Sequence, residues 1–258
     1  MGLTEAPHFR WHRSSRSWLR DWRAPLVWAL VTVIPGAGFV VAGEFFYGAG
    51  ILALFVAAVP PLVKPGPRVQ IRDSAVEVRQ KRWFVNSYCM FPLAFGIGAV
   101  LMTAEHLQSS SRALSIRYVF VVACAYIAAL LTLSLWWRFR GSLRITGSEL
   151  RVGHSYTTSY DGLGIDMTPA RAGGFPYLTL TARKNAKARN LYPTMSYGLE
   201  ANSVCSTLRH LAETDEETRR SYSPELIREM LLFRPDREVA VGESIDVRIV
   251  AQPEDRTA

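Results

Sequence analysis

The side chains that could carry chemistry are few and scattered in this sequence. Histidines could serve as metal ligands or general bases, and the chain has five of them: His8, His12, His106, His154 and His210. They are not grouped as a ligand set, and the chain contains no GxxxxGK[ST], HExxH or GxSxG motif and no GxGxxG motif after a strand. We therefore predict no catalytic residue, no metal site and no cofactor, and we do not expect an enzyme.

The three cysteines agree with this interpretation. Cys89, Cys124 and Cys205 form neither a CxxC pair nor a paired framework, so the sequence supports neither a disulfide scaffold nor a zinc finger. No nucleophile in the sequence has a visible base partner. The function is therefore expected to depend on binding.

One group of charged side chains could bind a ligand. In the stretch "ARKNAKARN", a basic loop between two predicted strands contains Arg183, Lys184, Lys187 and Arg189. Such a loop could contact anionic headgroups or an acidic partner by Coulomb attraction. The alternative is a solvated hairpin tip, which the nearly neutral charge of the surrounding region favours.

Charge and composition divide the 258-residue chain into two unlike halves. Hydrophobic residues make up 49% and charged residues 20%, which is too apolar for a disordered chain and too charged for one wholly within lipid. The formal charge is +8, and the excess lies in the first half, which has 13 Lys and Arg against 6 Asp and Glu up to Trp137. Because these cations flank apolar segments, we predict no nucleic-acid binding.

Four apolar segments contain no charged residue or histidine between their ends: residues 25–41, 45–63, 84–102 and 118–137. A helix needs roughly 17 to 25 apolar residues to cross the hydrocarbon of a bilayer, where the backbone finds no other hydrogen-bond partner. The alternative is a set of buried helices in a large core, but such helices usually carry a polar stripe. The segments therefore predict four transmembrane helices.

The cations near the ends of these segments predict their orientation. They are frequent before the first segment, in the loop at residues 64–83 and after the fourth segment, and they are rare in the other two connections. By the positive-inside rule, both termini and the 64–83 loop are cytoplasmic. The alternative for the first segment is a cleaved signal peptide, although the segment exceeds the roughly 7 to 15 residues of a signal h-region. The sequence thus predicts a multi-pass protein of the cell (plasma) membrane.

The basic leader, residues 1–24, is predicted to lie at the membrane interface. On a helical wheel its tryptophans fall on one side and its arginines on the other. The residues concerned are Trp11, Arg13, Arg16, Trp18, Arg20, Trp22 and Arg23. In an interfacial helix the indoles lie at headgroup level and the arginines face anionic lipid. The alternative is that the arginines only fix the topology.

Glycines and prolines interrupt the first three apolar segments, among them Pro35, Gly36 and Gly48. Small residues let helices approach closely and prolines kink them, so packing is the simpler explanation. Interrupted helices also occur at transport sites. A small transporter or channel component is therefore the alternative function, although no Asp, Glu, Lys, Arg or His lies within the segments.

After residue 140 the apolar residues alternate with polar ones, which predicts strands joined by turns at Gly and Asp residues. The expected strands lie at residues 143–145, 150–152, 157–160, 163–167, 177–182 and 245–250. An apolar stripe predicts a helix over 200–213. Ser223 and Pro224 predict the N-terminus of another helix, within 221–233.

The segments "LRITGSELRVG", "SYDGLGIDM" and "ANSVCSTLRHLAE", in that order, resemble the pleckstrin-homology-like (PH-like) domains of bacterial membrane proteins. The resemblance covers residues 138–213 and consists of apolar and turn patterns. It implies a small curved antiparallel sheet capped by a helix. It also implies a non-catalytic module that binds a protein or a lipid headgroup at the cytoplasmic face.

The 64–83 loop contains a similar hairpin. "IRDSAVEVR" from Ile71 matches "ITGSELRVG" from Ile145 at Ile, Ser and two apolar positions, and a pair of apolar segments precedes each. A duplicated unit, of which the first copy kept one hairpin, would explain the match. Such a duplication predicts that the first hairpin pairs with the C-terminal sheet.

Together these patterns predict an α+β membrane protein with four transmembrane helices followed by a cytoplasmic antiparallel sheet capped by a helix. Its expected parts are the leader 1–24, a four-helix transmembrane region 25–137, a PH-like domain 138–213, and a linker, helix and partly disordered tail at 214–258. The expected function is that of a scaffold or adaptor. Its expected partners are the lipid bilayer and a membrane or cytoplasmic protein, and a homo-oligomer is left open.

Overall fold

The computed structural model describes residues 8–14, 23–43, 66–82, 141–154, 156–169, 176–182 and 185–249, with a few isolated residues and runs of two or three within 45–52 and 93–134. Contacts within the chain divide it into two units. Unit 1 consists of Met1–Arg20, Gly66–Lys81 and Gly141–Ala258, and unit 2 consists of Asp21–Pro65 and Arg82–Arg140. The long C-terminal part of the chain therefore shares one unit with two segments of the N-terminal half.

Unit 1 contains a five-stranded antiparallel sheet. Its strands, in spatial order, are β2 (Arg68–Arg72), β3 (Ala75–Arg79), β4 (Leu143–Ile145), β5 (Glu149–Val152) and β6 (Tyr156–Ser159). β3 pairs with β4, with Val76 opposite Ile145, which confirms the prediction that the first hairpin joins the C-terminal sheet. Since alternate residues of a strand face opposite sides, Val76 and Val78 are buried on the same face.

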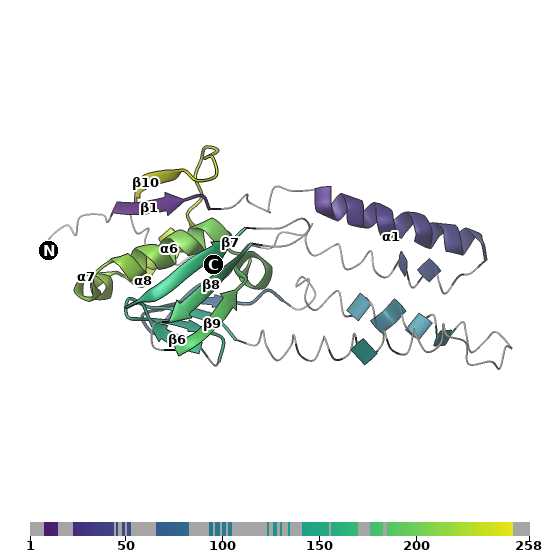
Figure 1. Ribbon diagram of the computed structural model, residues 1–258, viewed down its shortest axis with the longest axis horizontal. Coiled ribbons are helices and arrows are strands. Elements are labelled where there is room, and N and C mark those ends of the chain that lie inside the picture. Colours follow the sequence, from purple (N-terminus) through teal and green to yellow (C-terminus); the bar gives the residue numbers. More distant parts are fainter. Residues whose placement is uncertain are drawn as a thin grey trace, which may run out of the picture. The chain divides into compact units, whose positions relative to one another are not determined.

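A three-stranded antiparallel sheet follows in the chain. Its strands, in spatial order, are β7 (Leu163–Thr168), β8 (Tyr177–Ala182) and β9 (Asn185–Leu191), which lie side by side in Figure 1. Gly162 precedes β7 with a φ of 69°, a left-handed conformation that glycine adopts without strain. In β7 the buried Leu163 and Ile165 alternate with exposed residues, so one face of this sheet is also buried.

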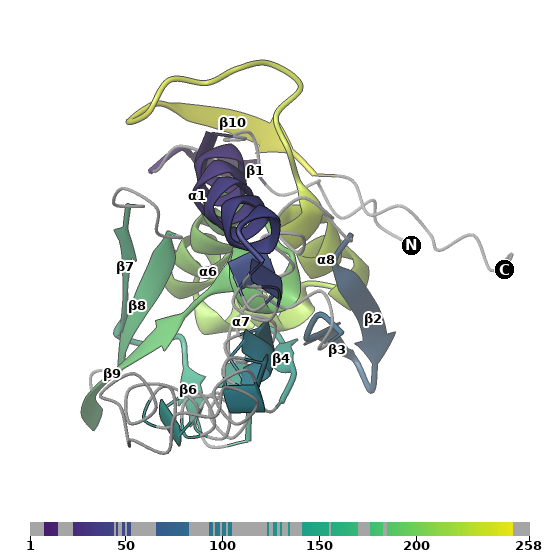
Figure 2. The ribbon, with the colours of Figure 1, turned by 90° about the vertical axis from the view of Figure 1, so that its right-hand side faces the viewer.

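Three helices complete the C-terminal part of unit 1 after a short π-helix, η3 (Pro193–Tyr197). They are α6 (Ala201–Glu213), α7 (Glu216–Ser221) and α8 (Pro224–Leu232). The Glu200 side chain caps α6 by accepting from the Ser203 N–H, and Ser223 caps α8 by accepting from the Leu226 N–H. In Figure 2 the three-stranded sheet lies on one side of α6, and the β2–β3 hairpin lies on the other side, next to α8.

The main core of unit 1 lies between the two sheets and these helices. It combines buried side chains of β3–β5, β7–β9, α6 and α8. The α6 contribution comes from Val204, Leu208 and Leu211, none of which is exposed. Burial of each such side chain contributes roughly 1.5–3 kcal/mol, so this core is the principal source of stability of the unit.

A two-stranded ribbon packs on the helices separately from the main core. β1 (His8–His12) pairs antiparallel with β10 (Ser244–Arg248), and Trp11 lies opposite Ile245. Phe9 and Trp11 belong to a second apolar cluster that includes Met230 of α8. Figure 1 shows the ribbon beside α6. The structure thus has a strand where the sequence pattern favours a helix, because pairing with the distant β10 and burial of both aromatic residues replace the expected contact with lipid.

In unit 2 the structure describes one long helix, α1 (Arg23–Val41), with Pro35 in its interior. A Cβ atom at Gly36 would lie 2.8 Å from Cγ of Leu52, and one at Gly48 would lie 2.4 Å from Cγ2 of Val40. These glycines therefore allow close packing, as predicted. On the exposed surface of α1 are large apolar residues: Leu26, Leu30, Val31, Val33, Ile34, Phe39 and Val41.

Within the described ranges, none of the helices has both the length and the apolar character that crossing a bilayer requires. This contradicts the prediction of four transmembrane helices, and with it the multi-pass membrane fold, the cell-membrane location and the transporter alternative. The physical reason is that an uncharged run shows only where charge is missing, whereas spanning requires one continuous apolar helix. The predicted first span lies in α1, a helix of 19 residues with Pro35 in its interior, and most of 45–63, 84–102 and 118–137 lies outside the described residues.

The division into units also differs from the predicted domains. Unit 1 combines parts of the predicted leader, the 64–83 hairpin, the PH-like region and the tail. The predicted helix within 221–233 is α8, and the predicted strand at 245–250 is β10. Residues 250–258, the end of the tail that we expect to be partly disordered, lie outside the described residues.

Candidate functional site

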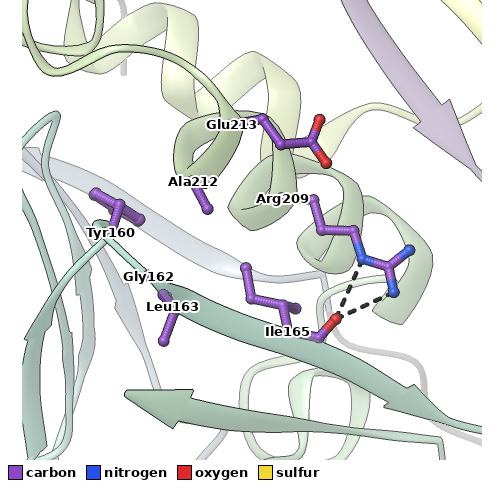
Figure 3. A pocket seen from close by; sticks show the side chains of 7 residues that line it. All are labelled: Tyr160, Gly162, Leu163, Ile165, Arg209, Ala212 and Glu213. Atoms are coloured by element: carbon purple, nitrogen blue, oxygen red, sulfur yellow. Dashed lines mark hydrogen bonds between the residues drawn. The ribbon is translucent and has the colours of Figure 1, made fainter. Parts of the chain in front are cut away.

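The open edge of β7 and the adjacent face of α6 form the candidate site. In the described part of the chain β7 pairs with β8 alone, so its other edge presents backbone groups that no strand pairs with. Between this edge and α6 lies a cavity of about 280 Å³ (Figure 3). It is lined by Tyr160, Gly162, Leu163, Ile165, Arg209, Ala212 and Glu213.

Arg209 of α6 reaches across to the open edge of β7. Its Nε and Nη2 atoms both donate to the backbone oxygen of Ile165, at 3.3 and 3.1 Å (Figure 3). The Ile165 carbonyl therefore points toward α6. Arg209 thus occupies one backbone acceptor of the edge and places a cation at the cavity.

The rest of the cavity combines apolar walls with one carboxylate. Leu163 and Ile165 are 8% and 7% exposed, and the half-buried Ala212 contributes only a methyl group. Glu213, four positions after Arg209 on the same helix, is exposed. The cavity can therefore hold an apolar side chain with charged groups of either sign beside it.

Tyr160 fixes the turn that leads into β7. Its hydroxyl donates to the backbone oxygens of Thr146 and Glu149, at 3.0 and 3.3 Å. Burial raises the pKa of Tyr160 far above its usual value, so the phenol remains protonated and keeps donating. Its ring also lies under the Arg219 guanidinium, with Cζ 5.3 Å from the ring centroid. Tyr160 is therefore a positioning residue for the site.

Arg219 of α7 joins the end of α6 to two turns of the sheets, although it is only 2% exposed. Its Nη1 donates to the backbone oxygens of Leu211 and Thr214, at 3.0 and 2.8 Å, and its Nε donates to that of Gly147 at 3.3 Å. Its Nη2 donates to Oδ1 of Asp161 at 2.9 Å. A buried cation is tolerated here because these acceptors satisfy its donors. The geometry of the cavity depends on this connection.

The described residues around the site offer little reactive chemistry. Cys205 on α6 is 1% exposed, and burial raises the pKa of its thiol to about 11, so the reactive thiolate is scarce at neutral pH. Across the described ranges, no group of His, Cys, Asp and Glu side chains could hold a metal ion. The geometry suits recognition of another molecule.

The predicted basic loop does not line this cavity. Lys187 and Arg189 lie in β9, and Arg189 is half-buried opposite Leu180 of β8. Arg183 and Lys184 lie outside the described residues. Part of the expected loop is therefore strand, and its binding role stays a prediction.

The structure places two of the predicted membrane-interface side chains inside unit 1. Trp11 is 3% exposed, and its Nε1 donates to Oγ of Ser203 at 3.1 Å. Arg13 donates from Nη1 to the backbone oxygen of Val239 and lies 3.7 Å from a carboxylate oxygen of Glu238. Arg23 begins α1. The remaining four, Arg16, Trp18, Arg20 and Trp22, lie outside the described residues.

The sequence reasoning missed the residues that line the cavity. Arg209, Ala212 and Glu213 have the i, i+3, i+4 spacing of one helix face, and this spacing was the available signal. It does not reveal that β7 lies beside that face with an open edge. That information is in the tertiary structure alone.

The chain was compared with protein-family models, with curated protein sequences and with solved structures. No match was found in any of the three comparisons. The geometry of the cavity between β7 and α6 is therefore what points to a function.

Proposed function

We propose that unit 1 is a non-catalytic, PH-like module that binds an extended segment of a partner protein along the open edge of β7. The observation that carries this proposal is the cavity of about 280 Å³ between α6 and a strand paired on one side. An extended segment can add to such an edge through its backbone. Its alternate side chains then enter the adjacent cavity, which gives specificity.

The chemistry of the lining suggests the sequence of the segment. An apolar side chain would contact Leu163, Ile165 and Ala212. An acidic side chain beside it would attract Arg209, which then releases the Ile165 carbonyl to the incoming backbone. We therefore expect the partner segment to combine an apolar with an acidic residue.

The order of the elements supports the PH-like part of the proposal. An antiparallel sheet of five strands precedes one of three strands, and α6 follows and packs against the core between them. Antiparallel strands followed by a closing helix, in the described part of 141–213, support this part of the proposal, because the resemblance implies a small antiparallel sheet capped by a helix. Function depends on the site and not on the fold. The proposed function is therefore tested by peptide binding.

A substitution that fills the cavity tests the proposed binding. Random peptides displayed on phage are selected on the full-length protein and measured against the Ala212→Phe variant. The added ring occupies the space between α6 and β7, so we expect the selected peptides to bind the variant at least tenfold more weakly. We also expect them to share an apolar-plus-acidic pattern.

The matched control places the same ring elsewhere. Ala240 is exposed, in the turn before β10, and Ala240→Phe should leave peptide affinity unchanged. Peptides that bind the Ala212→Phe variant as tightly as the parent protein would refute the proposed site. Failure to select any peptide would count against an extended partner segment.

A further inference from the structure

A second groove in unit 1, between α6 and β10, is filled by the chain itself. Residues 8–14, here called the N-terminal strap, lie in it and include β1. We infer that this groove is a peptide-binding site, that the N-terminal strap is the ligand it holds in cis, and that the strap of a second copy of the chain can replace it.

The groove binds the strap through its backbone on both edges. On one edge the strap pairs with β10. On the other edge Oγ of Ser206 accepts from the His12 N–H at 2.9 Å and donates to the His12 carbonyl at 3.4 Å, while Oδ1 of Asn202 accepts from the Ser14 N–H at 3.0 Å. These polar side chains of α6 thus bind the strap as a neighbouring strand would. Backbone recognition of this kind is typical of bound extended peptides.

Two aromatic side chains anchor the strap in the groove. Phe9 and Trp11 are 0% and 3% exposed, and they share one face because they are two residues apart on a strand. The Trp11 indole donates to Oγ of Ser203 at 3.1 Å. The Phe9 ring meets the rings of His210 and Phe233 edge-on, with centroids 5.8 and 6.1 Å apart. Buried aromatic anchors with a paired polar atom are the usual hot spots of an interface.

The ion pair between Arg10 and Asp246 lies at the rim of the groove, whereas Arg13 of the strap is largely buried and donates to the Val239 carbonyl. Nε of Arg10 is 3.1 Å from Oδ1 of Asp246, but both side chains are more than half exposed. Exposed ion pairs contribute little to stability. The specificity of the groove is therefore expected to depend on the buried side chains of the strap, chiefly the aromatic residues at positions 9 and 11.

The strap can leave without disrupting the main core. Phe9 and Trp11 belong to the second apolar cluster, with Leu226, Met230, Val239 and Ile249, and none of these six is part of the main core cluster. Along the chain, the strap is separated from the rest of unit 1 by Asp21–Pro65 of unit 2. Displacement therefore exposes one cluster and one strand edge while the two sheets keep their packing.

The strap of a second copy presents the same anchors and backbone to the groove. Exchange of an identical element between two copies retains every contact and produces a swapped dimer. The strap of the same chain competes as a tethered ligand, at an effective concentration that the tether sets. A test of exchange must therefore cut the covalent connection between the strap and the rest of its own chain.

Cutting the tether after folding provides the test. A protease recognition sequence is inserted at residues 15–20 of the full-length protein, which is cut once it has folded. The probe is a fluorescein-labelled peptide of residues 6–16. We expect the cut protein to exchange its strap for the probe in a saturable manner and to bind a Trp11→Ala probe at least tenfold more weakly. A cut protein that keeps its strap against excess probe, or that binds both probes equally, would overturn the inference.

A second measurement uses the uncut chain. The Trp11→Ala variant should melt at a lower temperature than the parent, and addition of the unlabelled 6–16 peptide should raise its melting temperature. The Trp11→Ala peptide should not raise it. The Arg10→Ala variant, changed at the exposed rim, should melt close to the parent. If the parental peptide gives no rise, the groove does not accept a strap in trans.

Discussion

Arg219 and Tyr160 show how two side chains can join elements that are distant in the sequence. Arg219 donates to Gly147, which lies 72 positions earlier, and to Asp161, which lies 58 positions earlier. Tyr160 lies under this guanidinium and donates to two carbonyls around the β4–β5 turn. Loss of either residue leaves buried polar groups without partners, which costs more than the hydrogen bonds contribute. The position of the β6–β7 turn beside the end of α6 therefore depends on a few polar atoms.

Gly147 is the residue at which this arrangement is least tolerant of change. A Cβ atom there would lie 2.2 Å from the backbone oxygen of Arg219, so either the turn or α7 must move. We expect Gly147→Ala to lower the free energy of unfolding by about 1–3 kcal/mol, as overpacking typically does. Urea denaturation followed by circular dichroism measures the change.

The matched control is a glycine with space around it. A Cβ atom at Gly164 would lie 3.6 Å from its nearest neighbours on Thr181, an ordinary contact distance. Gly164→Ala should therefore change the free energy of unfolding by less than about 1 kcal/mol. Equal destabilisation by the two substitutions would show that the contact with Arg219 is not the cause.

At the scale of elements, His210 connects α6 to β1 and to the N-terminal side of α8. Its ring stacks on Tyr222 with the centroids 5.8 Å apart, its Nε2 lies 3.1 Å from the Tyr222 hydroxyl, and Phe9 meets it edge-on. Burial lowers the pKa of His210, although Glu213 opposes the shift. The folded protein thus favours the neutral imidazole at the contact between α6 and the ribbon.

This lowered pKa predicts a loss of stability in mild acid. Below the unfolded pKa of about 6.5 the unfolded chain binds more protons than the folded protein, so stability falls until the pH has passed the lowered folded pKa. The His210→Phe variant should show a smaller drop in melting temperature between pH 7.5 and 5.5 than the parent. The pKa of Asp215 is lowered by the hydrogen bond from the Thr218 N–H. Its contribution to stability is therefore lost only in the more acidic range below pH 4. Identical pH dependence of the two proteins would exclude His210 as the cause.

Elements with local signals were predictable from the sequence. The strands around Gly147, the helix α6 and the Ser223 cap of α8 agree with expectation because alternation, an apolar stripe and a capping residue act over a few residues. β1 was not predictable, because its partner β10 lies more than 230 positions away. The prediction of membrane spans was made from a lack of charge, which does not by itself make a helix long and apolar enough to cross a bilayer. That the edge of β7 lies beside Arg209 is known only from the tertiary structure, which brings β7 and α6 together.

At the scale of the whole molecule, unit 1 is assembled from three separate stretches of chain. The middle stretch supplies β3, whose Val76 and Val78 are fully buried in the main core. The first stretch supplies Phe9 and Trp11 to the second cluster. The C-terminal stretch alone therefore lacks parts of both clusters.

A fragment of residues 141–258 should consequently fail to fold as a unit. It exposes the edge of β4 that pairs with β3 and the apolar groups that β1 covers. We expect no cooperative thermal transition by circular dichroism and increased binding of an apolar dye, compared with the full-length protein. A cooperative melt at the full-length melting temperature would show that the first two stretches are dispensable.

The ribbon of β1 and β10 has a consequence for biosynthesis. His8 pairs with Arg248, so the ribosome must add 240 residues after the first partner before the second exists. At about 5–20 residues per second this takes roughly 12–48 s. For most of that interval Phe9 and Trp11 lie outside the exit tunnel without their final neighbours, and they are accessible to a chaperone at least until β10 has been translated.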